Sequence, residues 1–192
     1  LTSAIQLNAK IISYNSKNDQ TALTYLEEQV KKFPTNGELR LFYIAALLDN
    51  NQLTQALPNL QILTKDKKYG GEAYIMLGEI YISQDKIPLA TASIKNALPF
   101  ADSSDKAKFY LGQLAEYSKD NIQAIKWYED VSENSEFQTQ AYLRAAYLYS
   151  TAGNYADALE LLQNANPTSF DDQKQLLLTQ IDILIDSNDY DK

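Results

Sequence analysis

The apolar and polar positions of this chain follow the pattern of amphipathic helices arranged in consecutive pairs. In the clearest pair, Tyr74, Leu77 and Tyr81 have the i, i+3, i+7 spacing that gathers side chains on one face of a helix. After a polar turn, Ile87 and Ile94 show the same seven-residue spacing in a second segment. Because similar pairs recur along the sequence, the pattern predicts an all-α protein.

The pairs have a fixed period of 34 residues, marked by an alanine in the second segment of each pair. A fixed period is typical of repeat proteins, in which each unit buries its apolar face only by stacking on its neighbours. The small side chain is expected where the second helix approaches the first. The five alanines are Ala22, Ala56, Ala90, Ala124 and Ala158. They divide the chain into a single array of units at about 3–36, 37–70, 71–104, 105–138, 139–172 and a partial 173–192.

One unit carries Leu77-Gly78-x-x-Tyr81 followed by Ala90-x-x-x-Ile94. These positions resemble the tetratricopeptide repeat (TPR), whose pattern places Leu-Gly, an aromatic residue and an alanine at these intervals. The resemblance implies a right-handed superhelix, an α-α solenoid of antiparallel helix pairs whose first helices line an inner groove. It also implies that the chain is a scaffold that binds an extended peptide or a partner helix in this groove.

The candidate partner-binding residues are those of the first helices that lie off the packing face. They form an aromatic and aliphatic set with few charges, and Met and Tyr suit an adaptable peptide-binding surface. The alternative is that half of them only pack between repeats. A clamp for a peptide's terminal carboxylate is disfavoured, because only Lys106 and Arg144 supply the right charge there. The candidates are Phe42, Met76, Glu79, Lys106, Tyr110, Gln113, Tyr117, Arg144 and Tyr147.

The net charge and the length of the apolar runs limit the classes of partner that the chain can bind. The formal net charge is −8, whereas nucleic-acid binding and anionic membrane surfaces need a basic face. We therefore expect a protein or peptide partner and no nucleic acid. The longest apolar run, 41–48, is too short to cross a bilayer, so we expect no direct membrane insertion.

The residue types disfavour catalysis. The chain has no cysteine and no histidine, which excludes thiol nucleophiles, disulfides, zinc–thiolate sites and an imidazole base. The acidic clusters lack the ligand spacing of a calcium loop, and no Gly-rich phosphate loop is present. We expect no metal, no cofactor and no enzyme activity. An enzyme that uses only paired carboxylates is the remaining catalytic alternative.

Several local features depart from the repeat pattern. Lys10 and Ser13 replace the small and aromatic residues of a first helix, so the first unit is atypical. Pro58 should kink its helix or delay its start, whereas Pro88 suits a first turn. The segment 102–105 is predicted to be a helix N-cap region.

The C-terminal segment leads to two further predictions. The segment 173–185 is predicted to be a helix that is apolar nearly all round, which favours self-association into a homo-oligomer through that helix. It also indicates a fragment of a longer array.

The source and compartment are inferred from composition and from a second resemblance. The basic residues are nearly all Lys, which together with abundant Asn and Ile points to a bacterial source. The order of units and the segments 164–167 and 188–192 resemble long TPR proteins of the Gram-negative envelope. Some of those tether and activate a carboxyl-terminal processing protease, which is a further alternative function. We favour the bacterial envelope (periplasm) over the cytoplasm.

Overall fold

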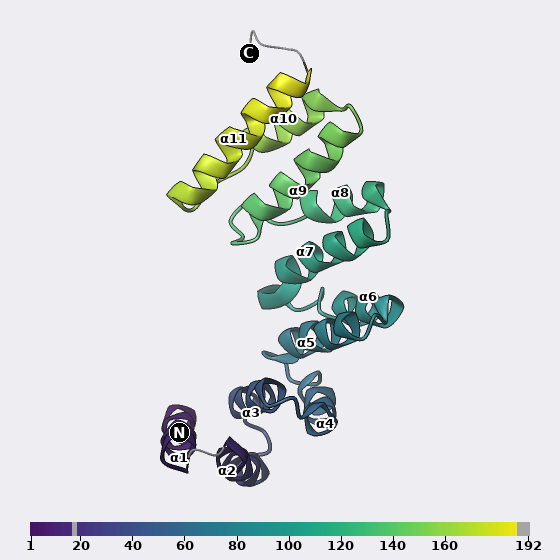
Figure 1. Ribbon diagram of the computed structural model, residues 1–192. Coiled ribbons are helices and arrows are strands. Elements are labelled where there is room, and N and C mark those ends of the chain that lie inside the picture. The colour runs from purple at the N-terminus through teal and green to yellow at the C-terminus, as the bar shows by residue number, and fades with distance from the viewer. Residues whose placement is uncertain (17–18, 188–192) are drawn as a thin grey trace. The chain divides into compact units, whose positions relative to one another are not determined.

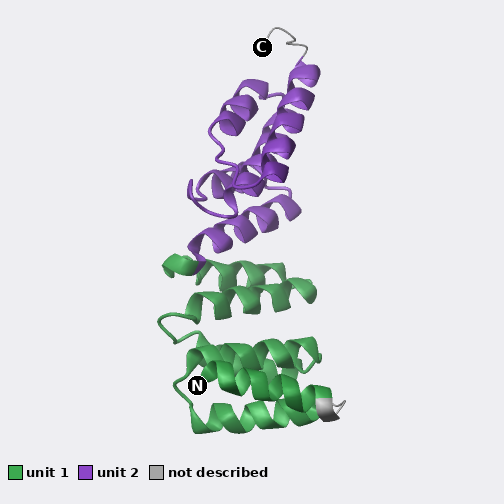
Figure 2. Ribbon diagram, turned by 90° about the vertical axis from the view of Figure 1, so that its left-hand side faces the viewer, with its two compact units in different colours: residues 1–102 green, residues 103–192 purple. Residues whose placement is uncertain are grey.

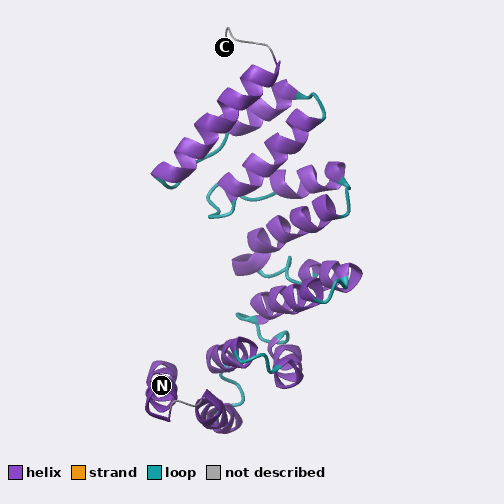
Figure 3. Cartoon of the chain, viewed as in Figure 1, coloured by secondary structure: helices purple, strands orange, loops and turns teal. Residues whose placement is uncertain are grey.

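The structure is a computed structural model that describes residues 1–16 and 19–187 (Figure 1). The resemblance noted at 188–192 lies outside the described residues. The described part of the chain consists of eleven α-helices joined by short loops and contains no strand (Figure 3). The helices are α1 Thr2–Ser16, α2 Asp19–Lys32, α3 Gly37–Asp49, α4 Leu53–Leu63, α5 Gly70–Ser83, α6 Ile87–Lys95, α7 Ala101–Tyr117, α8 Asn121–Glu129, α9 Gln138–Thr151, α10 Tyr155–Gln163 and α11 Phe170–Ser187.

The chain forms two compact units, Leu1–Asp102 and Ser103–Lys192, which Figure 2 shows in two colours. The boundary falls in the first turn of α7. Within unit 1, α1 packs on α2, α3 on α4 and α5 on α6. Within unit 2, α9 packs on α8 and α10, and α11 packs on α10 and α9. Each unit therefore builds its core from consecutive helices.

The recurring alanines lie in the second helices and are buried. Ala56, Ala90, Ala124 and Ala158 are fully buried. The first helices meet them closely: a Cβ added to Gly78 would lie 3.5 Å from the carbonyl oxygen of Ala90 and would collide with Ile94. In the next pair, a Cβ on Gly112 would lie 2.6 Å from Cδ1 of Tyr128. Small residues are therefore required where the two helices approach.

The turns inside four helix pairs share one geometry that also recurs every 34 residues. The residue after the helix C-cap adopts a positive φ in each turn. The next residue then donates its N–H to a carbonyl five residues back, as from Lys86 to Tyr81 and from Asp120 to Ala115, at 2.8 Å and 2.9 Å. This is the Schellman motif, which satisfies the last carbonyls of a helix. The positive-φ residues are Asn51, Asp85, Lys119 and Gly153, with φ of 56°, 56°, 61° and 80°.

One local prediction is wrong, one is confirmed, and one of the two alternatives given for Pro58 is excluded. Residues 102–105 do not precede a helix, because α7 already begins at Ala101. Pro58 does not delay the start of α4, which begins at Leu53 and continues through the proline. Pro88 lies in the first turn of α6, where its missing N–H removes no intrahelical hydrogen bond.

Asp105 stabilises a later loop instead of capping its own helix. Its Oδ1 accepts hydrogen bonds from the backbone N and Oγ of Ser132, at 3.2 Å and 3.0 Å. Lys108 Nζ lies 3.3 Å from the same oxygen. Burial alone would raise the pKa of this carboxyl, but the bonds from Ser132 and Lys108 outweigh it and hold the pKa below its usual value. The carboxylate thus ties α7 to the segment after α8.

Lys119 gives a direct test of the turn geometry. A left-handed conformation costs a non-glycine residue about 1 kcal/mol, so Lys119→Gly should raise the free energy of unfolding by up to about 1 kcal/mol. The matched control is Lys126→Gly in the interior of α8, which should lower that free energy by about 1 kcal/mol. Urea unfolding followed by circular dichroism measures both variants. Destabilisation by both changes would contradict the geometry of this turn.

Candidate functional site

The candidate residues of unit 1 lie on two of its first helices. Phe42 is on α3 and is half-buried, and Met76 and Glu79 are on α5. Met76 is also half-buried and packs against the cluster that contains Ile44 and Leu60. Glu79 is exposed. Phe42 and Met76 therefore contribute to packing and still keep part of their surface accessible.

Unit 2 groups the remaining candidates on two neighbouring helices. One face of α7 carries its four candidates at i, i+4, i+7 and i+11. Tyr117 at the end of this face is 67% exposed, and Tyr147 on α9 is 61% exposed. Arg144 lies one turn before Tyr147 and is also exposed. The four residues of α7 are Lys106, Tyr110, Gln113 and Tyr117. We call these four together with Arg144 and Tyr147 the α7–α9 surface.

A hydrogen-bonded set of three side chains joins the helices beneath this surface. Arg144 Nη1 and the hydroxyl of Tyr128 both donate to Oε2 of Glu116, each at 2.8 Å. These groups come from α9, α8 and α7. Burial raises the pKa of Tyr128 above its usual value, and the bond to Glu116 adds to the effect. The buried tyrosine therefore stays neutral and acts as a donor that orients the carboxylate.

Arg144 is consequently a paired cation and not a free one. Burial opposes its charge, but Tyr128 and Glu116 outweigh this effect and raise its pKa. The Arg144 side chain is 44% exposed and that of Glu116 is 27% exposed. The pair with Glu116 uses one guanidinium nitrogen, Nη1, of a group that carries five N–H donors. The ion pair holds the guanidinium in place at the edge of the surface.

Aromatic residues support the α7–α9 surface from below. The ring centroid of Phe109 lies 5.6 Å from that of Phe137 and 5.9 Å from that of Tyr128. Tyr110 lies beside this cluster, with its ring centroid 6.3 Å from that of Phe109. Phe109 is buried and belongs to the core, whereas Tyr110 is half-buried at the border of the surface.

A second tyrosine connects α9 with α8. The hydroxyl of Tyr149 donates to Oε1 of Glu129 at 2.7 Å. Desolvation and this bond raise the pKa of Tyr149 to about 12. Such bonds between helices keep the α7–α9 surface rigid, which reduces the entropy lost when a ligand binds.

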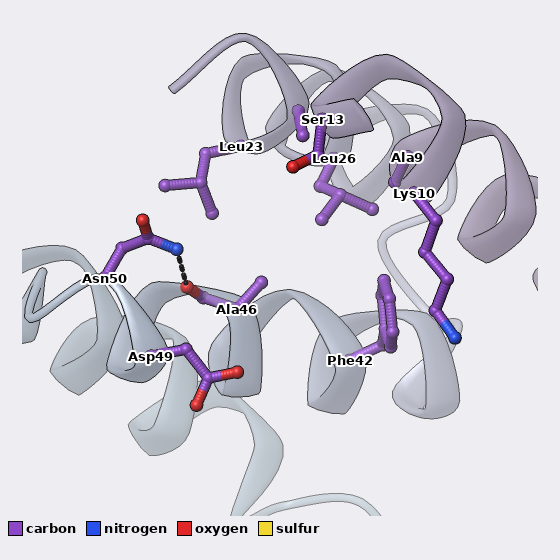
Figure 4. Close-up of a pocket in the computed structure, with 10 residues that line it drawn as sticks. Ala9, Lys10, Ser13, Leu23, Leu26, Phe42, Ala46, Asp49 and Asn50 are labelled. Carbon is purple, nitrogen blue, oxygen red and sulfur yellow. Dashed lines mark hydrogen bonds between the residues drawn. The ribbon is translucent and has the colours of Figure 1, made fainter. Parts of the chain in front are cut away.

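Unit 1 has an open pocket of about 330 Å³ among α1, α2 and α3 (Figure 4). Leu23 and Leu26 form a buried apolar floor. Lys10 and Phe42 lie toward one end, and Asp49 and Asn50 toward the other. The full lining is Ala9, Lys10, Ser13, Ala22, Leu23, Leu26, Phe42, Ala46, Asp49 and Asn50.

The described residues offer little for other chemistry. They contain no cluster of three or more acidic side chains that could hold a metal ion. None of the described helices is long and apolar enough to cross a membrane. The arrangement is suited to contact with other molecules through aromatic, apolar and a few charged groups.

Sequence reasoning missed three residues, namely Glu116 in unit 2 and Asp49 and Asn50 in unit 1. Glu116 carried no signal, because its partners Tyr128 and Arg144 are distant in the sequence. Asp49 and Asn50 were not recognised as lining a pocket. The sequence did carry one signal for the pocket, because Lys10 and Ser13, which depart from the repeat pattern, also line it.

Comparison with known proteins identifies the fold. No family model matches the sequence, and no curated protein matches it. Among solved structures, MamA is 17% identical with a TM-score of 0.61, over 100% of this chain and 96% of MamA. YrrB, described as a TPR protein with an unusual peptide-binding site, is 17% identical with a TM-score of 0.58, over 91% of this chain and 87% of YrrB. PilW, described as a widely conserved type IV pilus biogenesis factor, is 15% identical with a TM-score of 0.61, over 98% of this chain and 87% of PilW.

These similarities, together with the helical architecture, confirm the predicted fold class. The chain is an all-α TPR solenoid built from helix pairs. At these identities the similarity concerns the fold, and what the chain binds must be argued from its own surface.

Proposed function

We propose that this chain is a non-catalytic scaffold that binds a protein or peptide partner on the surface of its first helices. The observation that carries the proposal is the α7–α9 surface of unit 2, where Tyr117 and Tyr147 are mostly exposed beside a fixed arginine. Tyr and Arg are the residue types that most often dominate the energy of protein interfaces.

The physical properties of this surface support a protein partner. Its tyrosines offer large rigid contact areas with polar tips, which suit interfaces that are apolar and still wet. Arg144 offers planar donors to a carboxylate or a backbone carbonyl of the partner. The net charge of −8 disfavours nucleic acid as the partner.

We further propose that the chain functions in the bacterial envelope rather than in the cytoplasm. This assignment rests on the sequence resemblance to envelope TPR proteins and on the fold shared with PilW, a type IV pilus biogenesis factor. Binding there would connect other proteins without chemistry of its own.

Peptide display with a random library tests the proposed surface. The best peptide binder should lose at least about tenfold in affinity to a variant carrying Arg144→Gln and Tyr147→Ala, because interface arginines and tyrosines often contribute 2 kcal/mol or more. The matched control is Tyr14→Ala, which removes an exposed tyrosine from α1 in unit 1. It should bind the peptide like the unchanged protein.

Thermal unfolding separates this effect from a loss of structure. The Arg144–Glu116 pair is partly exposed, so its loss should lower the free energy of unfolding by only about 0.2–1 kcal/mol. Equal peptide affinity of the double variant and the unchanged protein, by fluorescence anisotropy, would show that the α7–α9 surface is not the binding site.

A second candidate function is self-association through α11. Besides Phe170 at its first position, this helix exposes four large apolar side chains on one side, each to 51–54%. An apolar surface of this kind often marks an interface between proteins. The four residues are Leu177, Leu178, Ile181 and Ile185.

Light scattering over a range of protein concentrations tests this candidate. The unchanged chain should form a dimer as the concentration rises, and a variant with Leu178→Gln and Ile181→Gln should remain a monomer. Thr179→Gln on the same helix serves as the control and should still dimerise. A chain that stays monomeric up to its solubility limit would exclude self-association.

A further inference from the structure

The pocket of unit 1 exists because short side chains line its walls. Ala9 and Ser13 of α1 and Ala46 of α3 lie around it together with Leu23 and Leu26 (Figure 4). Ala22 of α2 also lines it. The pocket has a volume of about 330 Å³. The pocket is open to solvent, so a side chain from outside can enter it.

Another helix pair of the same chain shows which side chain fits such a place. Tyr149 occupies the position of Ser13 four repeats later. It packs against a cluster that includes Ala146, Ala158 and Leu162. Their counterparts in the first pair are all lining residues of the pocket, namely Lys10, Ala22 and Leu26. The first pair thus lacks the aromatic ring that fills the equivalent place in the fifth pair.

Two polar residues of the pocket lining, Lys10 and Asn50, indicate which groups would surround an aromatic ring in the pocket. Lys10 stands where the fifth pair has Ala146, and it forms no ion pair with any residue that the structure describes. An ammonium group near an aromatic ring attracts the ring face and also attracts a neighbouring carboxylate. At the other end, Asn50 uses its Nδ2 to donate to the carbonyl of Ala46 at 2.8 Å. Its Oδ1 accepts no hydrogen bond from the described residues and could accept one from a phenol hydroxyl.

From these observations we infer that the pocket of unit 1 binds a tyrosine side chain of a partner peptide, with an acidic residue next to the tyrosine facing Lys10. This inference deepens the proposed function, on which it rests, because it defines the chemistry of one anchoring residue. The tyrosine ring lies on Leu23 and Leu26 beside Phe42, and its hydroxyl points to Asn50.

Amide NMR titration of the full chain tests the inference with defined probes. The probe is the blocked pentapeptide acetyl-Gly-Asp-Tyr-Gly-Gly-amide, compared with versions that carry Ala for Tyr or Lys for Asp. We expect saturable shifts of the amides of Ala9, Leu23 and Ala46 with the first peptide. The version with Ala should bind at least about tenfold more weakly, because it loses the burial of an aromatic ring.

Variants whose own larger side chains occupy the pocket provide a second test. Ser13→Tyr restores the ring found in the fifth pair and should abolish the shifts, whereas Ser3→Tyr, at an exposed position of α1, should leave them unchanged. If Ser13→Tyr fails to fold by circular dichroism, Ala46→Phe fills the pocket from α3 instead. Lys10→Glu, at an exposed position, should reverse the preference between the Asp and Lys peptides.

The outcomes separate this inference from the proposed function. Shifts confined to α7 and α9 would overturn the tyrosine pocket and leave the α7–α9 surface as the binding site. Absence of shifts, or shifts that persist in the filled variants, would also overturn the pocket, while the display experiment decides the proposed function independently. An equal response to the Asp and Lys peptides would overturn the assigned role of Lys10.

Discussion

The close approach of two helices at one small residue is the constraint on which this structure depends. A Cβ added to Gly78 of α5 would collide with the side chain of Ile94 of α6 and would lie in contact with the carbonyl oxygen of Ala90, at 3.5 Å. Dispersion contacts fall steeply with distance, so this approach lets the surrounding apolar side chains pack at the density of a protein interior. A larger residue at Ala124 would overpack the equivalent contact in unit 2. The position of Gly78 is taken by Gly112 in the next pair and by Ala146 in the fifth, whereas the first pair has Lys10 there.

This constraint also determines which surfaces remain available for binding. The second helices place their alanines against the first helices, and the opposite faces of the first helices then carry side chains that the core does not need. In unit 2, Glu116 holds Arg144 in place and is itself oriented by Tyr128. In unit 1 the atypical first pair leaves a pocket where another pair has Tyr149. The proposed pocket thus lies where the repeats differ, on a fold formed where they agree.

The sequence predicted the fold well because the repeating signal is local and periodic. The alanine spacing located the second helices, and Pro88 was placed correctly in a first turn. The positive-φ turns were not predicted, although Gly153, Asn51 and Asp85 are residue types that favour the left-handed region; Lys119 gives no such signal. The start of α7 was misjudged because polar residues at 102–105 suit both a cap and a first turn. The ion pair of Glu116 joins residues on different helices, and no sequence spacing reveals such a contact.

Cysteine accessibility tests the central claim most directly, because the chain has no cysteine of its own. Single variants would place a thiol at Ala90 or Ala124, inside the helix contacts, and at Glu79 or Tyr147, on the first-helix surfaces. The thiols at the two alanine positions should react with a water-soluble reagent at least about a hundredfold more slowly than those at the two surface positions. They react only when the helices separate. Reaction at Ala124→Cys as fast as at Tyr147→Cys, in a folded protein, would contradict the account.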